Sequence, residues 1–397
     1  MDIPEKFDFD DIAPINDKNF RARMAQLVTS QGLEHAVKYV MPDVDYPQFV
    51  EFLKGIPDKD TFQQEVMWPF MEMLAKKTTS GVSISGIEKI ESNKPVLFIT
   101  NHRDIVLDAS FLNICLLRRH LRTCEIAIGD NLLIMPWIDT LVRINKCFLV
   151  KRNVKRLEAL NAAKQLSAYI HHAICEKGEK VWIAQREGRA KDSSDRTQES
   201  LIKMLALSGG GATNQNLAEL NITPVSIAYE YDPNDYLKVR EFLLKRRDPG
   251  FKKSQRDDLF SMETGLLQFK GHIHFSVGDS ISPEIEALGD APRSTVLSTA
   301  CSLIDNSIHT RYKIYSINYI AYDELTGSDK YSMLYTGEER ERFIAYVDHQ
   351  LGKVDVKNIT PDERYFMRLM MFTMYANPLK NKVEAERQSE QATPSIV

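Results

Sequence analysis

The sequence predicts an α/β fold with a mixed, mostly parallel sheet flanked by helices, and with helical extensions at both ends. Between residues 81 and 290, short apolar runs alternate with helical stretches, the pattern of strands joined by helical crossovers. Before residue 80, apolar residues recur at three- and four-residue spacing, as in amphipathic helices. We therefore expect a helical region at 1–80, an α/β domain at 81–290, and a helical region with a polar tail at 291–397.

Six apolar runs are predicted to be strands: Val96–Thr100, Glu125–Ile128, Cys147–Val150, Lys180–Ala184, Thr223–Tyr229 and His272–Val277. Between them, helices are expected after Asp104, around Leu132–Val142 and over Val154–Glu176. The terminal regions are predicted to hold helices at Phe20–Tyr39, Tyr46–Leu53, Thr61–Lys77, Thr295–Tyr312, Glu338–Leu351 and Pro361–Tyr375. Pro69 should kink or interrupt its helix. The polar tail after Asn377 is expected to be frayed.

The bulk composition narrows the class of protein. The chain has 397 residues, of which 43% are hydrophobic and 27% charged, as in ordinary globular proteins. A net charge of −4 gives no support to nucleic-acid binding. The five cysteines are scattered and form no C-x-x-C pair, which favours reduced thiols in a cytosolic protein. The acidic N-terminus is unlike a signal peptide, and no apolar run of about 18 residues occurs, so we expect no transmembrane helix.

The segment Asn-His-Arg-Asp at 101–104 lies between an apolar strand and an apolar helix. The carboxyl end of a strand is where α/β sheets usually bind ligands. A histidine there, with a carboxylate nearby, is a candidate general base. Alternatively, Asp104 caps the helix and His102 is only a turn residue. A protein-kinase loop is excluded, because Ala109 stands where the metal-binding Asn would be and no D-F-G follows.

Four blocks, in order, resemble those of the glycerol-phosphate and acylglycerol-phosphate acyltransferase superfamily. They are Asn101-His102-Arg103 with a downstream Asp, Gly129–Leu132 with Cys147–Arg152, Ile183–Arg189, and Ile222–Ile227. The resemblance covers roughly residues 85–285. It implies a fatty-acyl transfer enzyme in which His102 is the general base and Asp108 orients it, with direct transfer and no acyl-enzyme. Two departures matter. In block three, Gln185-Arg186 stands in place of the usual Pro before Glu187. In block one, the family's histidine and aspartate are five positions apart, whereas Asp108 follows His102 by six. Asp104 therefore stays open as the competing partner, with Asp108 favoured.

The resemblance also implies a site for the acceptor. Arg152 and Arg189 map onto block positions, and Arg103 and Arg186 are further candidate phosphate ligands, because guanidinium groups bind phosphate in a bidentate manner. Glu187 is expected to hold an acceptor hydroxyl or to anchor an arginine. Gly188 is expected to serve backbone geometry or close approach of the phosphate. The histidines lack metal-ligand spacing, so we expect no metal and no cofactor besides the acyl donor.

The implied activity is that of a bacterial-type enzyme of phospholipid biosynthesis. The donor would be acyl-CoA or acyl carrier protein, and the acceptor a lysophosphatidic-acid-like lipid or glycerol phosphate. Two alternatives stay open: O-acylation of a lyso-aminolipid, or a non-catalytic lipid- or carrier-binding protein on the same fold. We expect a cytoplasmic protein held peripherally at the inner face of the cytoplasmic membrane. Three segments could contact lipid or simply pack in the core: Asn131–Val142, Thr61–Lys77 and Tyr365–Tyr375.

Overall fold

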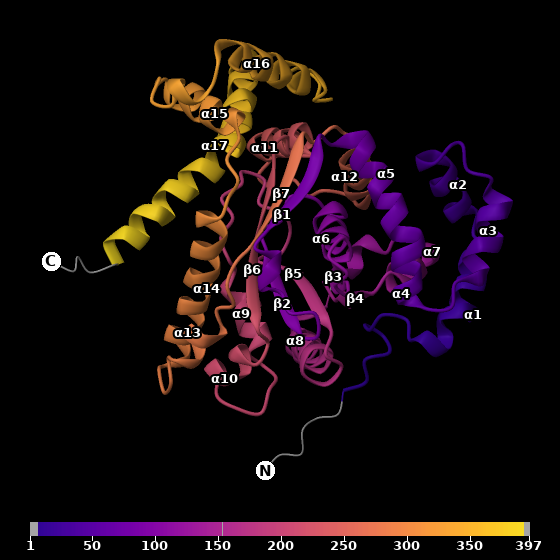
Figure 1. Ribbon diagram of the computed structural model, residues 1–397. Coiled ribbons are helices and arrows are strands. Elements are labelled where there is room, and N and C mark those ends of the chain that lie inside the picture. Colours follow the sequence, from indigo (N-terminus) through magenta and orange to yellow (C-terminus); the bar gives the residue numbers. More distant parts are fainter. Residues whose placement is uncertain (1–6, 153, 393–397) are drawn as a thin grey trace.

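The computed structural model describes residues 7–152 and 154–392 (Figure 1). In this part of the chain, seven strands form one sheet in the order β1-β7-β6-β2-β5-β3-β4. They are β1 (Gly81–Ser85), β2 (Val96–Thr100), β3 (Cys124–Gly129), β4 (Cys147–Val150), β5 (Lys180–Ala184), β6 (Ile222–Tyr229) and β7 (His272–Val277). All neighbours are parallel except β6 and β7. The predicted mixed, mostly parallel α/β sheet is therefore confirmed.

The six predicted strands are all present, with ends that differ by at most one residue. The sequence analysis missed β1, an edge strand that pairs with β7 from Gly81↔His272 onward. Its residues, GVSIS, include two serines and a glycine and are too polar to stand out as an apolar run. This strand forms only because β7 offers it a partner from a distant part of the chain.

Both faces of the sheet are covered, as parallel sheets require. Leu97 and Ile99 of β2 point into a core made with α8 (Arg156–His171), α9 (Glu199–Leu205) and α14 (Arg293–Thr310). Val96 and Phe98, on the other face, join a core made with α5 (Trp68–Thr78) and α6 (Leu107–Leu117). Figure 1 shows α14 and α6 on opposite sides of the sheet.

The N-terminal region consists of α1 (Asp17–Leu27), α2 (Gln31–Val40), α3 (Tyr46–Gly55), α4 (Lys59–Phe62), a π-helical turn (Gln63–Met67) and α5. Pro69 was expected to kink or interrupt its helix; it lies in the first turn of α5, directly after the π-helical turn that interrupts the α-helical pattern. The missing N–H of a proline is tolerated at that position. The π turn before it absorbs the change in hydrogen bonding that the proline would otherwise impose.

Several helices of the α/β region were not predicted. They are α9, α10 (Thr213–Ala218), α11 (Asp235–Arg247), α12 (Gln255–Leu267) and α13 (Ser282–Glu286), whereas α7 (Pro136–Ile144) corresponds to the helix expected around Leu132–Val142. Of these, α11 packs into a separate core with the C-terminal helices α15 (Ser316–Thr326), α16 (Gly337–Gly352) and α17 (Pro361–Ala392). In Figure 1, α15 and α16 lie at one end of the molecule, and α17 begins there and then extends away toward the C-terminus.

The expectation of a frayed tail after Asn377 is wrong. Helix α17 continues to Ala392, although Pro378 lies inside it. Leu379 is buried, and the Asn381 side chain donates hydrogen bonds to the carbonyls of Ser193 and Ser194 at 3.1 and 3.2 Å. Contacts with a distant loop, which composition cannot reveal, hold this half of the helix. None of the helices in the described ranges is long and apolar enough to cross a membrane.

Candidate active site

The turn between β2 and α6 is fixed to the neighbouring strand by Asn101. Its side-chain amide donates to the carbonyl of Ile227 at 2.9 Å and accepts from the N–H of the same residue at 2.8 Å. This pair of bonds continues the pairing of β2 with β6 one residue beyond the end of β2. His102 therefore leaves the sheet from a rigid point at its carboxyl edge.

His102 and Asp108 are brought together by this turn. The Nδ1 atom of His102 lies 2.8 Å from Oδ2 of Asp108, which is the second residue of α6. The six-residue separation is accommodated because His102 lies before the helix rather than on it. Asp108 is fully buried. Its carboxylate also accepts from the backbone N–H groups of Arg103 and Asp104 at 2.7 and 3.1 Å, and from the hydroxyl of Tyr229 at 2.9 Å.

Asp104 has another function and does not pair with His102. Its Oδ1 accepts from the N–H groups of Val106 and Leu107 at 2.9 and 2.8 Å, which satisfies free donors at the start of α6. Its Oδ2 accepts from the Asn234 side chain at 2.9 Å. Burial, reinforced by the nearby Asp108 carboxylate, raises the pKa of Asp104. Asp104 is therefore not the partner of His102. It caps the start of α6, as the other interpretation of the sequence expected.

A cavity of about 620 Å³ opens beside His102. Its lining comes from the carboxyl ends of β3, β4 and β5 and from α8, α9 and α12. One part of the lining is apolar and includes Ile128, Val150, Leu166, Leu201 and Met204. Another part is polar and includes Arg152, Arg186, Glu187, Arg189 and Lys191. Because Asp108 occupies Nδ1 of His102, Nε2 is the ring nitrogen left to act on a substrate.

The sequence of residues 81–228 matches the family model described as Acyltransferase. These residues form an acyltransferase domain. The match spans β1 to β6 and includes His102, Asp108 and the cavity-lining residues of block three, so the predicted superfamily is confirmed. The chain thus contains an acyltransferase domain with helical regions on both sides of it.

Two further comparisons add little to this identification. The crystal structure of the 1-acyl-sn-glycerophosphate (LPA) acyltransferase PlsC from Thermotoga maritima superposes with a TM-score of 0.40 and 11% identity, over 75% of this chain and 100% of that one. A likeness this low supports no conclusion about the substrates of the present acyltransferase. No curated protein matches the sequence.

The arginines of the acyltransferase cavity differ in their pairing. Arg152 forms an ion pair with Glu187 at 2.8 Å. Within the described part of the chain, Arg186 and Arg189 have no ion-pair partner, and Nη1 of Arg189 is buried without a hydrogen bond. Gly188 between them has a φ of +67°, in the left-handed region that favours glycine. Arg186 and Arg189 are therefore the cations available to an incoming anion.

Arg103 was predicted to bind substrate, and this prediction is wrong. Its guanidinium turns away from the cavity and forms a buried bidentate pair with Asp195 at 2.6 and 2.5 Å. The hydroxyl of Tyr312 also donates to Asp195. Burial alone would raise the pKa of Asp195, but the Arg103 guanidinium holds it below its ordinary value. Both charges are satisfied by each other, so Arg103 has a structural role.

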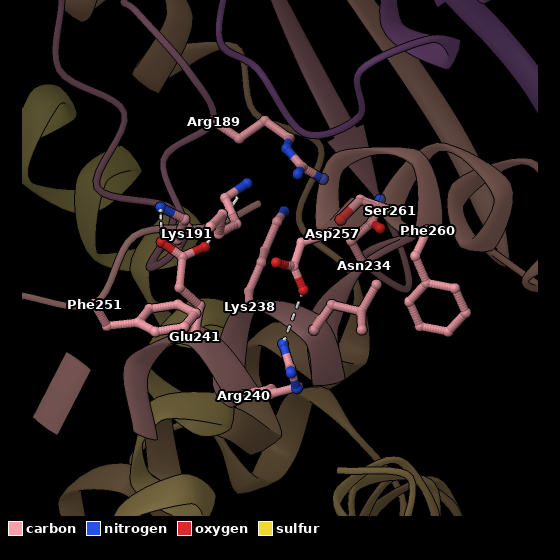
Figure 2. A pocket seen from close by; sticks show the side chains of 12 residues that line it. Arg189, Lys191, Asn234, Lys238, Arg240, Glu241, Phe251, Asp257, Phe260 and Ser261 are labelled. Atoms are coloured by element: carbon pink, nitrogen blue, oxygen red, sulfur yellow. Dashed lines mark hydrogen bonds and ion pairs between the residues drawn. The ribbon is translucent and has the colours of Figure 1, made fainter. Parts of the chain in front are cut away.

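A second, smaller pocket adjoins the cavity and shares Arg189, Lys191 and Lys253 with it. In Figure 2, Arg189 and Lys238 extend toward its centre from opposite sides. Lys238 donates to Asp232 at 2.5 Å, and Lys191 pairs with Glu241 at 2.6 Å. The sequence analysis missed Lys191, which lies between the third and fourth family blocks, and Lys238 and Lys253, which follow the blocks, because they resemble ordinary solvated charges. The basic side chains of α11 give no sequence signal that separates them from a surface helix.

Proposed function

We propose that this acyltransferase moves a fatty acyl group from acyl-CoA or acyl carrier protein to a hydroxyl of a glycerol-phosphate-type acceptor, with His102 as general base. The observation that carries the proposal is the buried Asp108 carboxylate 2.8 Å from Nδ1 of His102, beside a cavity with one apolar and one cationic wall. The apolar wall suits an acyl chain. The cationic wall suits a phosphate.

The reaction begins at the acceptor hydroxyl. Nε2 of His102 takes its proton as the oxygen attacks the thioester carbonyl, because a neutral hydroxyl is a poor nucleophile. Asp108 keeps the imidazole in the required tautomer and stabilises the imidazolium. The tetrahedral intermediate then expels the donor thiolate, which receives the proton from His102. One C–O bond forms, one C–S bond breaks, and the enzyme returns to its starting state.

Direct transfer is supported over an acyl-enzyme. An acyl-enzyme needs a serine or cysteine activated by the base. None of the five cysteines lines the cavity. Among the described residues, no serine or threonine hydroxyl forms a hydrogen bond with His102. The acceptor oxygen is therefore the nucleophile.

The acceptor phosphate binds Arg189 and Arg186 in this proposal. These two guanidinium groups lack acidic partners in the described chain, whereas Arg152 is already paired with Glu187. The buried, unbonded Nη1 of Arg189 is the strongest support, because an unsatisfied buried donor is costly unless a ligand completes it. The Arg152–Glu187 ion pair is then left to contact the part of the acceptor that carries the hydroxyl.

Peripheral contact with the inner face of the cytoplasmic membrane belongs to the same proposal. Of the three candidate segments, Thr61–Lys77 and Tyr365–Tyr375 contribute mainly to internal cores. Asn131–Val142 is different: Leu132 lines the cavity, and the Met135 side chain is 48% exposed nearby. An apolar, half-exposed segment at the cavity suits entry of a lipid substrate from an interface.

The test is thiol release from a long-chain acyl-CoA, with and without lysophosphatidic acid. Wild type should release thiol in an acceptor-dependent manner, and His102→Ala should lose roughly 10²- to 10⁴-fold of this activity. Arg189→Ala should raise KM for lysophosphatidic acid but not for an uncharged monoacylglycerol. His349→Ala, at an exposed position on α16, is the matched control.

Two outcomes would contradict the proposal. Undiminished activity of His102→Ala would exclude this histidine as the base. Failure of both lysophosphatidic acid and glycerol phosphate, with acyl-CoA and with acyl carrier protein, would exclude the proposed acceptor class. Acceptor-independent thiol release would instead indicate a hydrolase, and binding without release would indicate a lipid-binding protein.

A further inference from the structure

Three side chains with metal-binding atoms converge at the C-terminal end of α8. His171 is the last residue of α8, Cys175 lies in the π-helical turn that follows (His172–Glu176), and Glu219 follows α10. The Nδ1, Sγ and carboxylate oxygen atoms lie within 4.8 Å of one another. None of the three lines the catalytic cavity.

The hydrogen bonds of His171 define where its lone pair points. Nε2 lies 2.9 Å from the carbonyl oxygen of Leu205, which can only accept, so Nε2 carries a hydrogen. Nδ1 lies 2.6 Å from Oε1 of Glu219, a second acceptor. Either a proton or a metal ion must therefore lie between Nδ1 and the carboxylate. A histidine that donates one N–H to a backbone carbonyl and turns its other nitrogen toward further ligands has the arrangement typical of metal-bound histidines.

We propose that His171 Nδ1, Cys175 Sγ and the Glu219 carboxylate bind one zinc-type divalent ion, with water as the fourth ligand. A thiolate combined with an imidazole selects zinc-like metals over magnesium or calcium. Binding releases the Cys175 thiol proton to solvent, because the thiolate is the ligand.

The geometry needs only small side-chain movements. In a tetrahedral zinc site, bonds of about 2.0 to 2.3 Å separate neighbouring ligand atoms by roughly 3.3 to 3.8 Å. The His171–Glu219 contact of 2.6 Å must therefore widen, and the sulfur must approach. Cys175 and Glu219 are both exposed, so their side chains can rotate, while the buried His171 stays fixed by Leu205.

The site would connect elements that form the apolar wall of the cavity. Leu166 on α8 and Leu201 and Met204 on α9 line that wall. His171 lies five residues after Leu166, and Leu205, whose carbonyl orients His171, directly follows Met204. The ion is thus structural: it ties the end of α8 to Glu219 after α10, while the hydrogen bond from His171 to Leu205 links the site to α9, and it takes no part in the transfer step. Spacing along the chain does not reveal this site, because Glu219 is 48 positions from His171.

The experiment uses the full chain, stripped of metal by a chelator and titrated with Co²⁺ and then Zn²⁺. One Co²⁺ per chain should produce a thiolate-to-cobalt charge-transfer band in the near ultraviolet, and Zn²⁺ should abolish it. Cys175→Ser should lose the band, and Glu219→Gln should weaken binding at least about tenfold. Cys301→Ser, which removes a partly buried thiol on α14, is the matched control and should keep the band.

Absence of the thiolate band in wild type would overturn the proposal. A band that persists in Cys175→Ser, or unchanged affinity in Glu219→Gln, would place the ion elsewhere and overturn it as well. Both variants alter exposed side chains, and circular dichroism verifies that they fold. The readout is metal binding itself, so it is independent of whether the proposed transfer reaction is correct.

Discussion

Four donors converge on the carboxylate of Asp108: the His102 imidazole, the Tyr229 hydroxyl and the N–H groups of Arg103 and Asp104. Together they leave this side chain one orientation, and through it they orient His102. Tyr229 lies on β6, 121 positions from Asp108, and is no part of the sequence motif. Burial and the nearby Asp108 carboxylate raise the pKa of Tyr229, so its hydroxyl stays protonated and remains a donor. We regard Tyr229 as a positioning residue.

Replacing Tyr229 with phenylalanine removes this donor while keeping the ring. We expect kcat to fall roughly tenfold, about 1.4 kcal/mol, because hydrogen bonds to charged groups are worth about that much or more. KM for the acyl donor should change little, since Tyr229 is not among the residues that line the cavity. Steady-state kinetics measure both constants, with Tyr365→Phe at an exposed position as control. A raised KM with unchanged kcat would contradict the positioning role.

Arg103 was expected to bind substrate because of its position in the motif, but in the structure it pairs with Asp195. Arg103→Ala leaves the buried Asp195 carboxylate without its partner. We expect the free energy of unfolding to drop by about 3 to 5 kcal/mol, as for other broken buried ion pairs. Adding Asp195→Asn should restore part of it, because the uncompensated charge disappears. Denaturant unfolding measures these changes; unaltered stability together with a raised acceptor KM would favour the original binding role.

At the scale of elements, the catalytic turn is supported by helices that follow the matched family segment. Asn234, before α11, donates to Asp104, and Lys238 on α11 donates to the carbonyl of Arg103 at 3.2 Å. Helix α12 approaches so closely at Gly265 that a Cβ atom there would lie 2.0 Å from Oδ2 of Asp104. The domain of residues 81–228 therefore depends on α11 and α12 for the shape of its active site.

The Gly265→Ala variant tests this dependence. The added methyl must displace either α12 or the carboxylate that holds the start of α6, at an expected cost of about 1 to 3 kcal/mol. We expect a lower melting temperature and at least a tenfold loss of kcat/KM. Gly55→Ala is the control, because a Cβ at that position meets no atom within 4 Å. Unchanged activity in Gly265→Ala would show that α12 does not support the turn.

At the scale of the whole molecule, one buried carboxylate joins the C-terminal helices to the α/β region. Asp235, the first residue of α11, accepts from the hydroxyls of Tyr346 on α16 and Tyr375 on α17 at 2.6 and 2.8 Å. Burial raises the pKa of Asp235 to about 6 in spite of these hydrogen bonds. The join is therefore sensitive to pH.

The raised pKa of Asp235 determines how the stability of the fold changes with pH. As pH rises from 3.8 to about 6, the folded chain keeps a proton on Asp235 that the unfolded chain has released, so this contribution to stability is lost. The loss amounts to roughly 3 kcal/mol. Asp235→Asn has no such proton and should not show this loss. As pH rises from acidic to neutral, the unfolding free energy of wild type should therefore fall by about 3 kcal/mol more than that of the variant. Parallel curves for the two proteins would contradict a raised pKa.

The sequence by itself determined what depends on neighbours along the chain. Apolar runs located six strands within one residue, because a buried parallel strand must be apolar on both faces. The motif at 101–108 also brought His102 and Asp108 to notice, since a strand end, a turn and the first turn of a helix are local features.

Only the tertiary structure decided contacts between distant segments. It turned Arg103 toward Asp195, 92 positions away, and gave Asp104 to the start of α6 and to Asn234. It also held α17 in helical form beyond Asn377 by packing it on the loop at 192–194. A charged or polar side chain in a sequence has many possible partners. Which one it takes depends on the folded arrangement, because burial makes each such group find a partner close by.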